Sequence, residues 1–169
     1  NRKTFRLRPR IISDEKEKRK RIILTIGIGI LLSLLYIVIF SFSAQDADAS
    51  TDVSMEVTEK GIDMITGVTG HRFQALFGSE TVEWMEPVVR KLAHFTEYAV
   101  MGMLVCLGLG LWYERNSCRF WINIGWVSVS AAFDELHQLF VSGRYASVLD
   151  VLLDTAGGVF GIGLVWLGV

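Results

Sequence analysis

Long apolar stretches alternate with polar segments along this chain. The first covers residues 22–40, nineteen positions without a charged side chain. At a helical rise of about 1.5 Å per residue, this length approaches the roughly 30 Å hydrocarbon thickness of a bilayer. Three further stretches, at about 90–112, 120–140 and 148–169, have similar lengths. The pattern predicts an all-α polytopic membrane protein with four transmembrane helices and a partly helical segment, 41–87, between the first two.

Composition agrees with this class of protein. Hydrophobic residues make up 51% of the 169 residues and the mean hydropathy is +0.39, which excludes a disordered chain. A signal peptide has an apolar region of only about 7–15 residues, so segment 22–40 predicts an uncleaved anchor. Two cysteines are too few for a disulfide scaffold. Cys106 and Cys118 fall at different depths of the predicted bundle, so we expect both to be reduced.

Charge is distributed unevenly and predicts the orientation. Residues 1–21 hold ten basic and three acidic side chains, a balance of +7, whereas the other 148 residues sum to −8. Lys and Arg beside membrane helices mark the cytoplasmic side. We therefore expect 1–21 to be a basic cytoplasmic tail, 41–87 to lie outside and the C-terminus inside. The tail directly precedes a membrane helix, which favours contact with anionic lipids over nucleic acid.

The segment 41–87 predicts a helix lying at the membrane surface. Ser50 is a suitable N-cap for a helix that runs to about residue 64. Pro87 suits the first turn of the second membrane helix. We expect Val53, Val57 and Ile62 to lie on one side of this helix, and the side chains expected to pack onto the bundle or the interface are Phe73, Leu76 and Phe77.

Ionisable residues gather at the ends of three predicted membrane helices. Charged groups within such helices are costly and usually face the bundle interior or a cavity. In the predicted topology all three groups lie at the outer end, and the fourteen uncharged residues before Asp134 place it about 21 Å along its helix. This predicts a buried polar site. A purely structural network of interhelical hydrogen bonds is the alternative, and we expect Gly157 and Gly161 only to allow close helix contact.

Four motifs at these positions resemble the VanZ-like family of small bacterial membrane proteins, which is named for a protein associated with teicoplanin resistance. They are FSAQ at 42–45, RKLAHFTEY at 90–98, DELHQLF at 134–140 leading to Gly143 and Arg144, and Asp150 with Asp154, Gly157 and Gly158. Family members often have a proline before the Gly-Arg pair, where this chain has Ser142. The resemblance implies a four-helix domain over 22–169 in the bacterial cytoplasmic membrane and, in some members, lowered glycopeptide susceptibility. It assigns no reaction.

One hypothesis for the site is an enzyme or binding site for an anionic envelope component, such as a lipid-linked cell-wall precursor. Lys91, His94 and Arg144 would hold a phosphate group, and a carboxylate would act as general base. The candidate catalytic residues are His94, Glu97, Asp134, Glu135 and His137. The candidate substrate-binding residues are Gln45, Lys91, Tyr98, Gln138, Arg144, Asp150 and Asp154.

Two further hypotheses stay open at this point. A divalent metal ion bound by His94, Glu97, Glu135 and His137 is compatible with the residue types, although Glu135 and His137 point to different sides of an ideal helix. A non-enzymatic small transporter or envelope-binding protein is the other, with the polar cluster as a structural network. Charges near one end of the bundle disfavour transport, because alternating access favours a site near the midplane.

Overall fold

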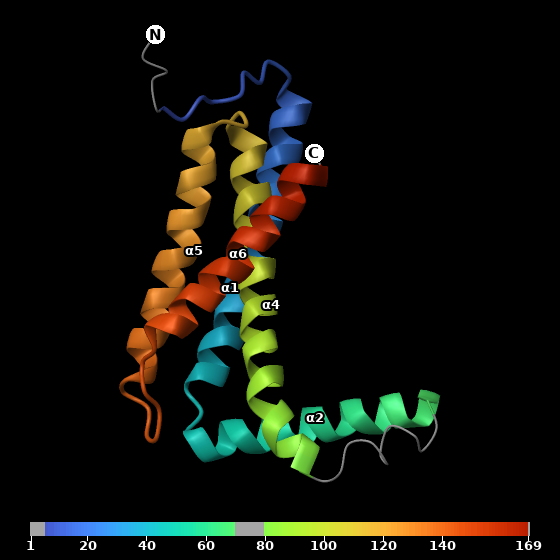
Figure 1. Ribbon diagram of the computed structural model, residues 1–169. Coiled ribbons are helices and arrows are strands. Elements are labelled where there is room, and N and C mark those ends of the chain that lie inside the picture. The colour runs from blue at the N-terminus through green and yellow to red at the C-terminus, as the bar shows by residue number, and fades with distance from the viewer. Residues whose placement is uncertain (1–5, 70–79, 169) are drawn as a thin grey trace.

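The structure, a computed structural model, describes residues 6–69 and 80–168, which form five α-helices (Figure 1). Four of them run lengthwise as a bundle, and α2 lies across one end. We call the end of the bundle that carries the α5–α6 connection the site end. The helices are α1 (Glu15–Ser43), α2 (Ala47–Thr69), α4 (Glu80–Trp112), α5 (Ser117–Gln138) and α6 (Val148–Gly168).

The first helix begins before its apolar stretch. The Asp14 side chain caps α1 by accepting a hydrogen bond from the backbone N–H of Lys16 at 3.0 Å. Glu15 and Glu17 in the first turn favour the helix start through the helix dipole. Glu17 also pairs with Arg21 one turn later, at 3.0 Å. These polar interactions extend the helix by about two turns into the basic tail.

Three helices of the described residues are long and apolar enough to cross a membrane: α1, the Met85–Trp112 part of α4, and α6. Much of the α1 surface is apolar and uncovered by protein, with Ile26, Ile30 and Leu34 all more than half exposed. Contiguous exposed apolar surface of this kind marks a lipid- or protein-facing region. The membrane character predicted from the sequence is therefore confirmed for these helices.

The helix α5 has its polarity reversed relative to a helix of a water-soluble protein. Its outer surface includes the exposed side chains of Trp121, Trp126 and Phe133. Its buried polar and charged residues are Arg119, Asn123, Ser130, Asp134, Glu135 and Gln138. A soluble helix buries its apolar stripe and exposes its polar face. The polar interior lowers the mean hydropathy of α5, which is not among the three helices identified above by length and composition.

The largest helix interface, between α4 and α6, depends on glycine. A Cβ atom at Gly157 would overlap the carbonyl oxygen of Phe95, and one at Gly161 would overlap that of Ala99. The two backbones therefore approach as closely as glycine permits. The expected role of Gly157 and Gly161 in close helix contact is confirmed.

The helix α4 extends well beyond its apolar stretch. It begins at Glu80 and contains Pro87 in its interior, so the prediction that Pro87 lies in the first turn is wrong. Proline removes only one backbone hydrogen bond, and contact with α2 stabilises the extension. The Ser54 hydroxyl of α2 donates to the buried Glu86 carboxylate, which Arg90 also approaches at 3.6 Å.

The helix α2 is longer than the sequence predicts. It starts at Ala47, so Ser50 lies in its first turn instead of capping it, and it continues to Thr69. The Ser54 hydroxyl oxygen also lies 2.8 Å from the Ser50 carbonyl oxygen, one turn earlier, which is an alternative acceptor for its single proton. The predicted apolar contacts of Phe73, Leu76 and Phe77 lie outside the described residues.

At the opposite end of the bundle, the N-terminal segment packs onto the α4–α5 turn. The Arg10 N–H donates to the Trp112 carbonyl at 2.7 Å, and the Glu114 N–H donates to the Arg8 carbonyl at 2.8 Å. Cys106 and Cys118 are both buried and free, as expected. The described part of the basic tail, residues 6–21, thus lies at the end of the bundle farthest from the ionisable clusters (Figure 1).

Candidate functional site

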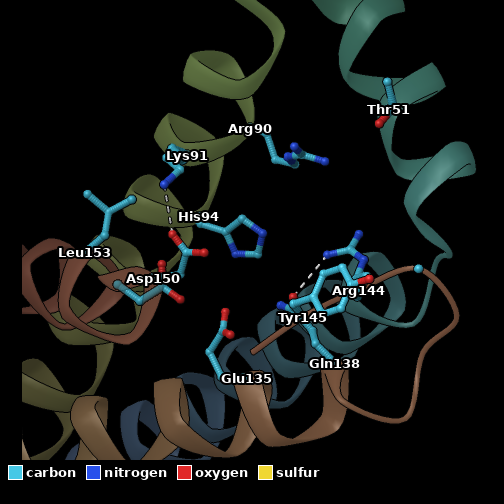
Figure 2. Close-up of a pocket in the computed structure, with 12 residues that line it drawn as sticks. Thr51, Arg90, Lys91, His94, Glu135, Gln138, Arg144, Tyr145, Asp150 and Leu153 are labelled. Atoms are coloured by element: carbon cyan, nitrogen blue, oxygen red, sulfur yellow. Dashed lines mark hydrogen bonds and ion pairs between the residues drawn. The ribbon is translucent and has the colours of Figure 1, made fainter. Parts of the chain in front are cut away.

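A polar cavity of about 310 Å³ lies at the site end, between α4, α6 and the end of α5 (Figure 2). The α5–α6 connection closes one side with Gly143, Arg144 and Tyr145, and Thr51 of α2 lies opposite. Four helices and one loop thus contribute to a single space. Seven predicted site residues line it: Lys91, His94, Glu135, Gln138, Arg144, Asp150 and Asp154.

Two neighbouring cations of α4 face this cavity. Lys91 Nζ pairs with Asp150 Oδ1 of α6 at 3.0 Å, and both side chains remain partly exposed. Arg90 pairs with Glu86 on its own helix and lines the cavity as well. An exposed ion pair contributes little to stability, so Lys91 can exchange partners with a ligand at small cost, whereas the Glu86 partner of Arg90 is buried.

Arg144 connects the α5–α6 loop to the end of α1. Its Nε donates to the Gln45 carbonyl at 2.9 Å, and its Nη2 donates to the Phe42 carbonyl at 3.4 Å. Its Nη1 donates to Gln138 Oε1 at 3.3 Å, and Gln138 Nε2 donates to Asp134 Oδ2 at 3.4 Å. A chain of polar contacts therefore runs from the loop to a carboxylate inside the bundle.

The electrostatic environment of Arg144 is unfavourable for an isolated cation. Burial, and after it the positive charge of Arg90, lowers the pKa of the Arg144 guanidinium below its ordinary value. The carboxylates of Asp134 and Glu135 oppose this shift. Arginine nevertheless keeps its proton at neutral pH, so two cations share one wall of the cavity. A bound anion would relieve their repulsion.

Glu135 fixes the loop that forms the cavity wall. Its Oε2 accepts a hydrogen bond from the Ser147 N–H at 2.7 Å, just before α6 begins. Ser147 in turn accepts a hydrogen bond from the Asp150 N–H through its backbone carbonyl at 3.1 Å. One oxygen of Glu135 thus has a structural role, which weakens the case for this residue as a free general base.

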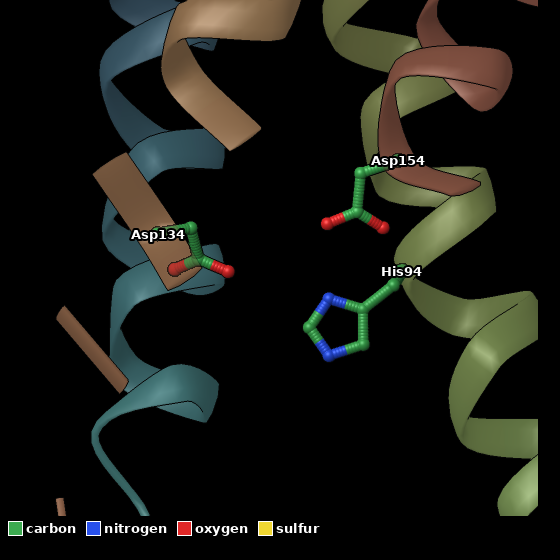
Figure 3. A group of neighbouring side chains, drawn as sticks. All are labelled: His94, Asp134 and Asp154. Atoms are coloured by element: carbon green, nitrogen blue, oxygen red, sulfur yellow. The ribbon is translucent and has the colours of Figure 1, made fainter. Parts of the chain in front are cut away.

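Three side chains from three helices converge at the inner wall of the cavity (Figure 3). His94 of α4, Asp134 of α5 and Asp154 of α6 each offer an atom within 4.8 Å of the other two. Asp134 is fully buried and Asp154 is 2% exposed. His94 and Asp154 line the cavity, and Asp134 faces them from α5 (Figure 3).

The metal set expected from the sequence is not the one that the fold assembles. His137 faces α1, where its ring meets the Phe40 ring edge-on at 5.5 Å between centroids. Glu135 is bonded to the loop, as described above. Asp134 of α5 and Asp154 of α6 lie beside His94 instead, because the packing of three helices brings these side chains together.

The remaining predicted residues have different positions. Tyr98 is 1% exposed and belongs to the hydrophobic core, so its place is that of a packing residue. Glu97 Oε2 lies 3.9 Å from His94 Nδ1. Gln45 contributes its backbone carbonyl to Arg144, while its side-chain Oε1 is buried without a hydrogen-bond partner among the described residues.

A second, smaller cavity of about 160 Å³ adjoins the polar one, between α2 and α4. Its walls are mainly apolar and include Phe42, Val53, Val57, Val89 and Ala93. Arg90, His94 and Arg144 line both cavities. Arg90 and this apolar wall were not among the site residues predicted from the sequence. Arg90 could have been predicted from its position beside Lys91 in the motif. The apolar wall could not, because it depends on how α2 packs against the bundle.

An all-helical bundle with an apolar surface and a polar cavity at one end defines a polytopic helical membrane protein. The chain belongs to the VanZ/LLP1 family, whose model matches residues 28–168. No curated protein and no solved structure matches the sequence.

Proposed function

We propose that this protein binds the anionic headgroup of a lipid or lipid-linked precursor of the bacterial cell envelope. The observation that carries this proposal is the junction of the two cavities. The polar cavity, lined by Arg90, Lys91 and Arg144, continues into the apolar cavity, and the two arginines line both cavities. An amphiphile with a charged head and an apolar tail fits such a junction.

The chemistry of the cations favours phosphate as the headgroup. Arg90 and Arg144 present planar guanidinium groups, which can bind phosphate through two parallel hydrogen bonds. Lys91 adds a more mobile charge from the adjacent position on α4. Three carboxylates, those of Glu135, Asp150 and Asp154, line the same cavity and match its three cations in number, so recognition would depend on geometry and not on bulk attraction.

We further propose that α1, α4, α5 and α6 all span the cytoplasmic membrane, with both termini inside and the cavity facing outward. The 22 residues of α5 are long enough, since they reach about 33 Å, and its apolar outer face suits contact with lipid. The basic tail supports the orientation. An outward cavity would meet cell-wall precursors, and binding them there would lower susceptibility to teicoplanin and related glycopeptides.

Cysteine labelling tests the orientation. In a background where Cys106 and Cys118 are replaced by alanine, Ser142→Cys should react with a membrane-impermeant maleimide in intact cells. Ser13→Cys should react only after lysis. Both serines are exposed in the structure, so accessibility within the protein does not limit either reaction. Labelling of Ser13→Cys in intact cells with protection at position 142 would contradict the orientation.

Lipid titration tests the binding site. In neutral detergent, a phosphatidic acid or another phosphomonoester lipid should raise the melting temperature of the protein, and phosphatidylcholine should not. Lys91→Gln should weaken the apparent affinity about tenfold. A hydrogen bond to a charged group contributes about 1.5–3 kcal/mol, and the low end applies here because Lys91 is partly exposed.

The control for this titration removes the same charge from the basic tail. Lys20 is exposed on α1 at the opposite end of the bundle, and Lys20→Gln should bind the lipid as the unmodified protein does. Equal losses in the Lys91 and Lys20 variants would mean that the tail attracts the lipid, and the cavity proposal would be abandoned.

A further inference from the structure

The cluster of His94, Asp134 and Asp154 holds buried oxygen atoms without partners. Asp134 Oδ1 and Asp154 Oδ1 are both buried and make no hydrogen bond within the described part of the chain. His94 Nδ1 is in the same condition. An ionised carboxylate removed from water is strongly unfavourable unless a positive charge or hydrogen-bond donors compensate it. Two such groups facing one space require a cation or a proton.

We propose that this cluster is a binding site for a divalent transition-metal ion. The three side chains point into one common space from three different helices (Figure 3), and their donor atoms lie within 4.8 Å of one another. Ligands at about 2.0–2.2 Å from a shared ion must lie within about 4.4 Å of each other. Small side-chain rotations are enough to meet that limit.

The donor set identifies the class of metal. Mg²⁺ and Ca²⁺ prefer all-oxygen ligands, whereas one imidazole with two carboxylates suits zinc or manganese. Three protein ligands leave at least one coordination position open, as in catalytic and exchangeable metal sites. His94 and Asp154 line the polar cavity, so the open position would face it.

Neighbouring side chains are arranged to orient these ligands. Gln138 Nε2 donates to Asp134 Oδ2 at 3.4 Å and is itself held by Arg144. Glu97 Oε2 lies 3.9 Å from His94 Nδ1, which is beyond hydrogen-bond distance and leaves this nitrogen available to an ion. An amide in the position of Gln138 fixes the orientation of a metal ligand. The metal site rests on the geometry and burial of this cluster and does not depend on the proposed lipid ligand.

Metal analysis and thermal melting of the full-length protein test this inference. Protein purified in detergent without chelator and reloaded with Zn²⁺ or Mn²⁺ alone should retain about one ion per chain after desalting. EDTA should lower its melting temperature, and either ion should restore it. Mg²⁺ at the same concentration should not.

Variants locate the ion. Asp134→Asn, Asp154→Asn and His94→Gln should each lower retention at least tenfold and abolish the response of the melting temperature to EDTA. Asp63→Asn, an exposed residue of α2, is the matched carboxylate control and should behave as the unmodified protein.

The competing explanation is a proton shared by the two carboxylates. In that case the unmodified protein would retain no ion, its melting temperature would not respond to Zn²⁺, Mn²⁺ or EDTA, and Asp134→Asn would stabilise it. The measurements on the unmodified protein are enough to overturn the metal site, so the test does not depend on whether the variants fold. If the unmodified protein retains the metal ion but binds no lipid, the result contradicts the proposed function and leaves the metal site standing.

Discussion

Gly161→Ala is expected to destabilise the bundle by about 3 kcal/mol, at the upper end of the usual cost of overpacking a core. The added Cβ would overlap the Ala99 carbonyl oxygen in the α4–α6 interface. Backbone cannot rotate aside as a flexible side chain can, so the two helices must separate along their contact. Unfolding by increasing SDS in mixed micelles measures this loss.

Gly163→Ala provides the matched control on the same helix. A Cβ at Gly163 would meet nothing within 4 Å among the described residues. Alanine has the higher helix propensity by up to about 1 kcal/mol, so this variant should be as stable as the unmodified protein or slightly more so. Equal stabilities for the two variants would show that α4 and α6 do not pack as described.

Arg144→Gln is expected to have the second-largest effect, because it lowers both the stability of the fold and the affinity for the proposed lipid. It removes donors to the Phe42 and Gln45 carbonyls, which anchor the α5–α6 loop to α1. At about 1 kcal/mol for each hydrogen bond, we expect a loss of about 2 kcal/mol in stability. Lipid affinity should fall at least tenfold, and both quantities can be read from one melting-temperature titration.

Arg144→Lys separates charge from geometry at this position. Lysine keeps the positive charge but offers a single ammonium group instead of a planar fork, so it cannot serve both carbonyls and a ligand. It should recover only part of the stability and of the lipid affinity. Full recovery of both by lysine would mean that Arg144 acts only as a point charge, contrary to the hydrogen bonds described.

Much of the architecture follows from the sequence, because each apolar stretch has the length of a membrane helix. The less predictable helix is α5, whose Asn123, Ser130 and Asp134 are polar yet buried. Its exposed aromatic side chains and buried polar side chains reverse the pattern of a helix in a water-soluble protein. The observed helices are longer than the predicted ones where polar contacts extend them. The Asp14 cap does so for α1, and the Ser54–Glu86 contact does so for α4.

The site is harder to predict, since it depends on how helices are paired and rotated. Contact of Gly157 with Phe95 places Asp154, one turn before that glycine, beside His94, one residue before that phenylalanine. No spacing within one helix reveals this pairing. Likewise, His137 is three residues after Asp134 and lies only about 60° from it around α5, yet its ring contacts Phe40 of α1 instead of joining the cluster.

Native mass spectrometry of the protein released from its own membranes would show whether the cavity at the site end holds an anionic envelope lipid. We expect about one phosphate-bearing lipid to stay bound per chain, with an occupancy that falls in Lys91→Gln but not in Lys20→Gln. Retention of neutral lipids only, or the same occupancy in both variants, would contradict it.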